Sequence, residues 1–179
     1  ASALYYLVHS TLVSAALFMI ADLVRCKRSE YRDSLVEGPG IARPMWLGLL
    51  FFVGALVVVG LPPTSGFVGK VLVLESVVDH AAVGWIWSIV LATSLLSLVV
   101  LGLAGSRLFW RTEEGTADAA LPGPGRAMAP IVLFGTIAVW TGFAGPARSY
   151  MHETARQLLD REAYIEAIDP AEFDPSKIE

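Results

Sequence analysis

The feature that most constrains this chain is a set of four long apolar blocks, at residues 3–24, 45–78, 84–105 and 127–147. A helix needs about 20 apolar residues, at about 1.5 Å each, to cross the hydrocarbon core of a bilayer. The chain is 55% hydrophobic and only 17% charged, whereas soluble domains carry about 25% charged residues. The sequence therefore predicts an all-α, polytopic membrane helix bundle, with about four spans by this length criterion.

The blocks divide the chain into two parts. Residues 1–149 are expected to form the transmembrane bundle and residues 150–179 an acidic tail. In the tail, apolar residues recur at helical spacing among charged residues, at Met151, Ala155, Leu158 and Ile165. This pattern predicts an amphipathic helix on the outer membrane surface or against a partner. An ordinary solvated helix fits this pattern as well. The chain begins in an apolar block with neither Met nor a basic flank, so we expect a segment of a longer protein and no signal peptide.

Basic residues in the connectors set the expected orientation. Residues 25–44 carry five Lys or Arg residues and residues 106–126 carry three, whereas residues 79–84 carry none. By the positive-inside rule, both basic connectors lie in the cytoplasm. The block at 45–78 must then cross the membrane once, as one broken span, and the tail lies outside. The single cysteine, Cys26, lies in the first basic connector and cannot form an internal disulfide.

The second block is broken at residues 62–66, within the sequence GLPPTSGFVGK. Pro62 and Pro63 have no backbone N–H and disfavour helical geometry in the residues before them. Carbonyls that lose their donors are tolerated in a membrane only inside protein or beside a water-filled cavity, so this segment is expected in the bundle interior. A simple proline kink would explain the break alone equally well. The next three residues add hydroxyls and room for water: Thr64, Ser65 and Gly66.

Lys70 follows the break and lies nine residues before Asp79. That is about 13 Å along a helix, near the middle of a hydrocarbon core of ~30 Å. A charged lysine at that depth costs roughly 2.5–3.5 kcal/mol on insertion scales, and such residues usually mark ion or proton pathways. Glu75 projects about 140° away around the same helix, so it is not the partner of Lys70. We predict that Lys70 carries protons; the alternative is a structural ion pair with an acidic residue on a helix that this segment does not contain.

His9, in the outer half of the first block, is the second candidate, because imidazole titrates near neutrality and can pass a proton through its two nitrogens. Tyr5 lies one turn away on the same face, within reach of a hydrogen bond to His9. In the third block, four hydroxyl residues are candidates to line a hydrated path: Ser88, Thr93, Ser94 and Ser97. The alternatives are that His9 is a packing residue and that the hydroxyls join neighbouring helices.

Three segments carry a resemblance to a known family. They read YYLVHSTLVSAALFMIADL at 5–23, GLPPTSGFVGKVLVLE at 60–75 and LLDREAYIEAI at 158–168. Together and in this order they resemble the C-terminal part of the D-type subunit of the Mrp-type multisubunit Na⁺/H⁺ antiporters. That family is similar to the proton-pumping membrane subunits of respiratory complex I.

The resemblance implies a proton-translocating subunit of a multisubunit cation/proton antiporter, with Lys70 and His9 on the proton path and residues 45–78 as the broken helix of the second of two inverted repeats. It implies a location in the cytoplasmic membrane. The expected partners are the lipid bilayer, the other membrane subunits of a hetero-oligomeric antiporter, protons and Na⁺. Neither a cofactor nor nucleic acid is expected. Two alternatives remain: a proton-pumping membrane subunit of a complex I-like redox complex, and a structural membrane subunit without transport. The sequence contains no motif for a nucleotide, flavin, iron–sulfur cluster, metal or nucleophile triad, so we expect a transporter subunit rather than an enzyme.

Overall fold

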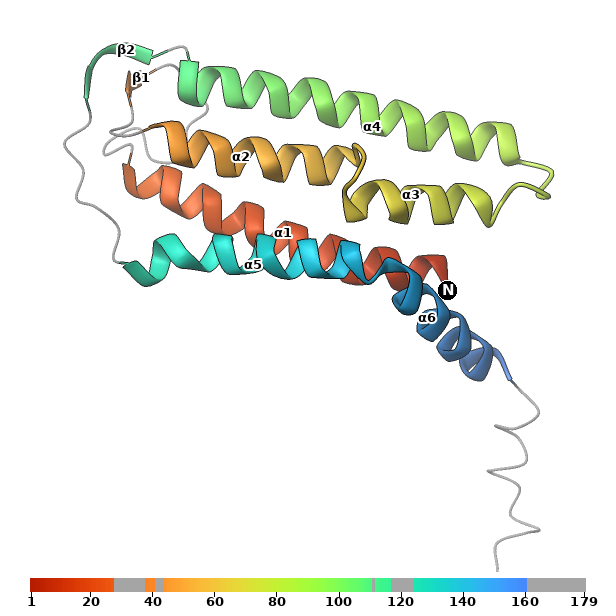
Figure 1. The fold of residues 1–179 in the computed structure, drawn as a ribbon. Helices are drawn as coiled ribbons and strands as arrows, with labels where there is room; N and C mark the ends of the chain where they lie inside the picture. The colour runs from red at the N-terminus through yellow and green to blue at the C-terminus, as the bar shows by residue number, and fades with distance from the viewer. Residues whose placement is uncertain (28–37, 41–43, 111, 117–123, 161–179) are drawn as a thin grey trace, which may run out of the picture.

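The chain forms a bundle of long helices that run side by side (Figure 1). Two of them, α1 (Ser2–Lys27) and α5 (Pro124–Gly142), lie together on one side. The computed structural model describes residues 1–27, 38–40, 44–110, 112–116 and 124–160.

The second apolar block forms two helices rather than one. These are α2 (Pro44–Val59) and α3 (Ser65–Glu75), which follow one another along the length of the bundle (Figure 1). The third block forms α4 (Val83–Gly105), which runs back along α2 and ends in a π-helical turn, η2 (Ser106–Trp110). The broken segment therefore passes through the bundle once, in two halves.

Several helices have the length and composition of membrane spans. Ser2–Lys27, Val83–Trp110 and Gly125–Gly142 are long and apolar enough to cross a membrane, and Met45–Val59 is a shorter apolar helix. The expectation of an all-α, polytopic membrane bundle with one discontinuous helix is confirmed.

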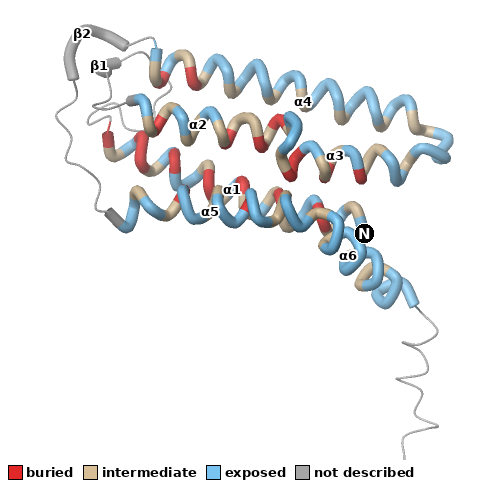
Figure 2. Tube along the Cα trace, viewed as in Figure 1, coloured by how far each residue is buried: buried red, intermediate tan, exposed pale blue. Residues whose placement is uncertain are grey.

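Helix α1 is the centre of the bundle and contacts α2, α3, α5 and the last helix, α6 (Ala144–Leu159). One stripe along it is buried. Apart from the adjacent pair Leu23 and Val24, its successive members are three or four residues apart, so that they share one face of the helix. Figure 2 shows this stripe as buried positions along α1. Its members are Tyr5, His9, Val13, Ala16, Ile20, Leu23, Val24 and Lys27.

Helix α4 packs far less tightly than α1. Within α4 only Gly105 is buried, where the absent side chain leaves room for the ring of Phe51 on α2. The remaining surface of α4 is apolar and exposed along most of its length (Figure 2). Such a surface is suited to lipid tails or to a further membrane helix.

A short β pairing joins the two basic connectors. β1 (Gly38–Gly40) pairs in parallel with β2 (Thr112–Thr116). Both connectors therefore lie at one end of the bundle, while Ala1 and the turn between α3 and α4 lie at the opposite end (Figure 1). The sequence did not predict this pairing.

The fourth block ends earlier than expected. Helix α5 stops at Gly142, and α6 (Ala144–Leu159) leaves the bundle at an angle (Figure 1). Pro146 has no N–H to donate to the carbonyl of Gly142, so the helix is interrupted there and restarts. Half-buried Ala147 and Met151 lie on one face of α6, which contacts α1. The rest of the expected tail helix, including Ile165, and most of the acidic tail lie outside the described residues.

Candidate functional site

The break between α2 and α3 lies midway along the bundle (Figure 1). Gly60 ends α2 with φ +74°, a conformation that glycine adopts without strain. The N–H groups of Gly60 and Leu61 both donate to the carbonyl of Leu56, at 3.0 and 3.1 Å. α3 then begins at Ser65, with Thr64 as its N-cap. The chain thus closes one helix and opens the next within a few residues.

Two carbonyls at the end of α2 have no N–H partner in their own helix. In an α-helix, the carbonyl of residue i accepts a hydrogen bond from the N–H of residue i+4. For Val58 and Val59 those residues are Pro62 and Pro63, which have no N–H. Both carbonyls are therefore left with their lone pairs free at the centre of the bundle.

The ammonium group of Lys70 fills this gap. Its Nζ donates to the carbonyl oxygen of Val59 at 2.7 Å and to that of Val58 at 3.4 Å. It also donates to the hydroxyl of Ser94 on α4 at 2.7 Å, and that hydroxyl donates in turn to the carbonyl of Val90 at 2.7 Å. An ammonium has three N–H donors, and all three are used. The partial negative charge at the C-terminus of α2 also favours a cation there.

Lys70 is held by neutral oxygens. Among the residues that the structure describes, no carboxylate bonds to it. Glu75, five residues further along α3, instead pairs with Arg148 of α6, whose Nη2 lies 3.2 Å from each carboxylate oxygen. An acidic partner for Lys70, the alternative given above, would have to come from outside the described residues.

His9 lies on the other side of the break. Its ring is buried, and its Nδ1 is 2.9 Å from the hydroxyl oxygen of Ser65, the first residue of α3. Gly66 makes this approach close: a Cβ there would overlap the carbonyl oxygen of Val57 and lie 3.2 Å from Cε1 of His9. The start of α3 therefore packs directly between the end of α2 and His9.

Tyr5 does not make the hydrogen bond expected from its spacing to His9. Its ring stacks on Trp140 of α5, with centroids 5.4 Å apart, and its hydroxyl is buried with no partner among the described residues. Nε1 of Trp140 is likewise buried without a partner in the described residues. An unpaired buried polar group costs about 1–3 kcal/mol. A buried water molecule is the usual remedy.

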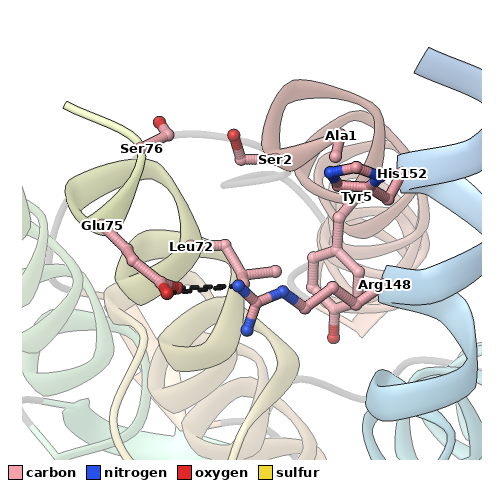
Figure 3. A pocket seen from close by; sticks show the side chains of 8 residues that line it. All are labelled: Ala1, Ser2, Tyr5, Leu72, Glu75, Ser76, Arg148 and His152. Carbon is pink, nitrogen blue, oxygen red and sulfur yellow. Dashed lines mark hydrogen bonds and ion pairs between the residues drawn. The ribbon is translucent and has the colours of Figure 1, made fainter. Parts of the chain in front are cut away.

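A cavity of about 300 Å³ lies at the end of the bundle where α1, α3 and α6 meet. Figure 3 shows Tyr5 and Leu72 in its wall and the Arg148–Glu75 ion pair across it, with His152 above. The cavity thus extends from the end of the bundle to Tyr5, which lies one turn before His9 on α1.

The hydroxyl residues of the third block differ in what they contact. Thr93 and Ser97 donate to carbonyls of their own helix, at 2.8 Å to Ile89 and Thr93 respectively, and neither bonds to Lys70. Ser94 is the residue that reaches the lysine. Adjacent positions on a helix differ by about 100° in direction, so the side of α4 that packs on α2 and α3 decides which hydroxyl faces Lys70.

The sequence of this chain matches a known protein family. Residues 1–97 match the family model described as NADH:quinone oxidoreductase/Mrp antiporter, TM. The chain belongs to this family. The matched segment of this chain includes the broken helix, Lys70 and His9.

Similar relatives carry two kinds of name. The chain is 31% identical over 170 residues to the D-type subunit of a Na⁺/H⁺ antiporter of Alkalihalophilus pseudofirmus, covering 94% of this chain and 34% of the relative. It is 31% identical to the D-type subunit of a probable K⁺/H⁺ antiporter of Rhizobium meliloti, covering 89% and 34%. It is 32% identical to the N-type subunit of an NADH-quinone oxidoreductase of Desulforudis audaxviator, covering 72% and 24%. These matches confirm the resemblance to the D-type antiporter subunits and their relation to complex I; the chain spans about a third of the length of the antiporter subunits it matches.

Proposed function

We propose that this chain is part of a proton-translocating subunit of a multisubunit cation/proton antiporter in the cytoplasmic membrane, and not of an enzyme. The observation that carries the proposal is the Lys70 ammonium, which lies at a helix break in mid-bundle on neutral oxygens of Val59 and Ser94. Ionisable groups retained at such depth usually belong to ion or proton pathways. The names of the antiporter relatives agree with this reading.

The hydrogen bonds of Lys70 suit a group that loses and regains a proton. A neutral amine keeps two N–H donors, and two of the three bonds are short, at 2.7 Å to Val59 and to Ser94. The third bond, to Val58, is long at 3.4 Å. Deprotonation by itself therefore needs to break only the weakest of the three bonds.

His9 and Ser65 give Lys70 a route to one surface in this proposal. His9 can take a proton at one ring nitrogen and release one at the other, and its Nδ1 already faces the Ser65 hydroxyl. The cavity beside Tyr5 supplies a hydrated approach to His9 from the end of the bundle. By the positive-inside rule, that end is the outer one.

A second function has support from the same comparisons. A proton-pumping membrane subunit of a complex I-like redox complex would use the same lysine and histidine, and the relatives named as N-type subunits of NADH-quinone oxidoreductase belong to such a complex by name. We favour the antiporter because the matches to D-type antiporter subunits cover more of this chain. Its further partners would be the other membrane subunits of that antiporter, with Na⁺ or K⁺ as the exchanged cation.

Thiol labelling tests the orientation and the hydrated approach together. In right-side-out vesicles, an impermeant thiol reagent should leave Cys26 unmodified, because the basic connectors are cytoplasmic.

In a Cys26→Ser background, Leu72→Cys in the cavity wall should react from outside. Val13→Cys, in the apolar core of the same bundle, should not react from either side; the two positions are comparably buried, at 9% and 5% exposure. Ready labelling of Cys26 from outside would reverse the orientation, and protection of Leu72→Cys would remove the hydrated route.

Ser94→Ala tests whether the hydrogen bond from Lys70 to Ser94 matters for transport. The substitution removes one of the two short bonds of Lys70, so cation-driven proton movement in everted vesicles should fall about threefold to tenfold, the factor that one hydrogen bond carries. Ser94→Thr keeps the hydroxyl and should restore most of the rate. Ser88→Ala is the matched control, since Ser88 donates to Gly84 of its own helix. Equal rates in Ser94→Ala and Ser88→Ala would show that Ser94 does not position the lysine.

A further inference from the structure

Three oxygen atoms surround Nζ of Lys70, and none of them depends on the lysine for its position. The carbonyl of Val58 and that of Val59 are fixed by α2 and freed by the two prolines that follow. The hydroxyl of Ser94 is fixed by its own bond to the carbonyl of Val90. The lysine therefore occupies a cluster of ligands that the rest of the fold builds.

Such a cluster has the chemistry of an alkali cation site. Backbone carbonyls replace the hydration shell of K⁺ in channel filters, and the carbonyls of unwound helices coordinate Na⁺ in transporters. The C-terminus of α2 adds a partial negative charge. We propose that the oxygens of Val58, Val59 and Ser94 also bind Na⁺ or K⁺, with water completing the shell, in exchange for the Lys70 ammonium.

The proposal rests on the proposed function, because Lys70 must be able to lose its proton. The exchange is balanced: a cation enters the cluster, Lys70 changes from –NH₃⁺ to –NH₂, and one proton leaves. The cluster carries one positive charge before and after, so the free carbonyls are never left without a cation. The cation and the proton exclude one another at a single place, as antiport requires.

The other ionisable groups near the cluster are few in the described part of the chain. Helix α1 brings His9, Tyr5 and Tyr6, and Glu75 on α3 is paired with Arg148. Helices α2 and α4 carry no ionisable side chain, and α5 carries only Arg126, near its start. Within the described residues, His9 is therefore our candidate to accept the proton released from Lys70.

Cation binding to the full-length subunit, assembled with its partner subunits and purified, tests the site directly. The comparison is Lys70→Ala, which empties the cluster, with Lys70→Arg, which keeps a permanent cation in it. Binding of Na⁺ and K⁺ is measured with choline chloride at equal ionic strength as the reference. Lys70→Ala should bind one more cation per subunit than Lys70→Arg. Adding Ser94→Ala to Lys70→Ala should weaken that extra binding about threefold to tenfold, by loss of one ligand.

A second measurement does not depend on the assembly of the alanine variant. Adding Na⁺ or K⁺ to the unsubstituted complex in weak buffer should release protons, and Lys70→Arg should not release them, because guanidinium does not deprotonate. Equal cation binding in Lys70→Ala and Lys70→Arg, or proton release that survives in Lys70→Arg, would overturn the site. If antiport is nevertheless lost in Lys70→Arg, the proposed function stands without this site. If antiport persists in Lys70→Arg, the proposed function itself fails.

Discussion

Lys70→Arg should abolish proton-coupled cation transport while the subunit remains in its complex. Arginine can donate to the carbonyl of Val59 and to Ser94, so the helix break keeps its hydrogen-bonded cation. Its guanidinium does not release a proton, so it cannot carry one. Transport in everted vesicles, normalised to the amount of subunit, should fall by at least about 100-fold, as expected for loss of a group that transfers protons.

The comparison variants separate charge from proton transfer. Lys70→Ala should also lose transport, and in addition it leaves the carbonyls of Val58 and Val59 without a donor, at about 1–3 kcal/mol for each group that stays unpaired. Lys27→Arg makes the same exchange at the end of α1, away from the break, and should retain transport. If Lys70→Arg transports as well as Lys27→Arg, Lys70 is a structural charge.

Gly66→Ala should destabilise the subunit more than any other single methyl group added in the helices described. Its Cβ would overlap the carbonyl oxygen of Val57 and lie 3.1 Å from Cα of Gly60 and 3.2 Å from Cε1 of His9. A backbone carbonyl cannot rotate away as a side chain can, so we expect a loss of about 3 kcal/mol or more. The temperature at which the solubilised complex dissociates would report it.

Gly102→Ala is the control for this substitution. No atom lies within 4 Å of the Cβ that it adds, and alanine is a better helix former than glycine by roughly 0.5–1 kcal/mol. Its dissociation temperature should stay the same or rise slightly, which is opposite in sign to Gly66→Ala. Similar values for the two variants would show that the start of α3 does not pack tightly against α2.

The sequence was most informative for features that depend on residues close together in the chain. The apolar blocks predicted the helices, and Pro62, Pro63 and Lys70 predicted the break and an ammonium just beyond it. The spacing of Tyr5 and His9 suggested a hydrogen bond that does not form, because Trp140 takes the ring of Tyr5 and Ser65 takes the ring nitrogen of His9. Both partners lie far away in the sequence.

Nothing in the sequence indicated that Ser94, rather than its neighbours, would bond to Lys70. Helix α4 is apolar on nearly every side, so its pattern does not mark the face that packs on α2 and α3. Which of Thr93, Ser94 and Ser97 meets Lys70 depends on how the helix is rotated in the bundle. The ion pair of Glu75 with Arg148 is of the same kind, since it joins helices that lie far apart in the chain.

The proline pair and the lysine depend on one another for their hydrogen bonds. If Pro62 and Pro63 were replaced by residues with a backbone N–H, the carbonyls of Val58 and Val59 would regain donors from their own helix. Lys70 would then lose these two carbonyls as free acceptors. If Lys70 alone were lost, the prolines would leave both carbonyls unsatisfied. Replacing all three together would remove both problems, and a plain continuous helix would then cross the membrane. Stability alone therefore favours a helix without this motif.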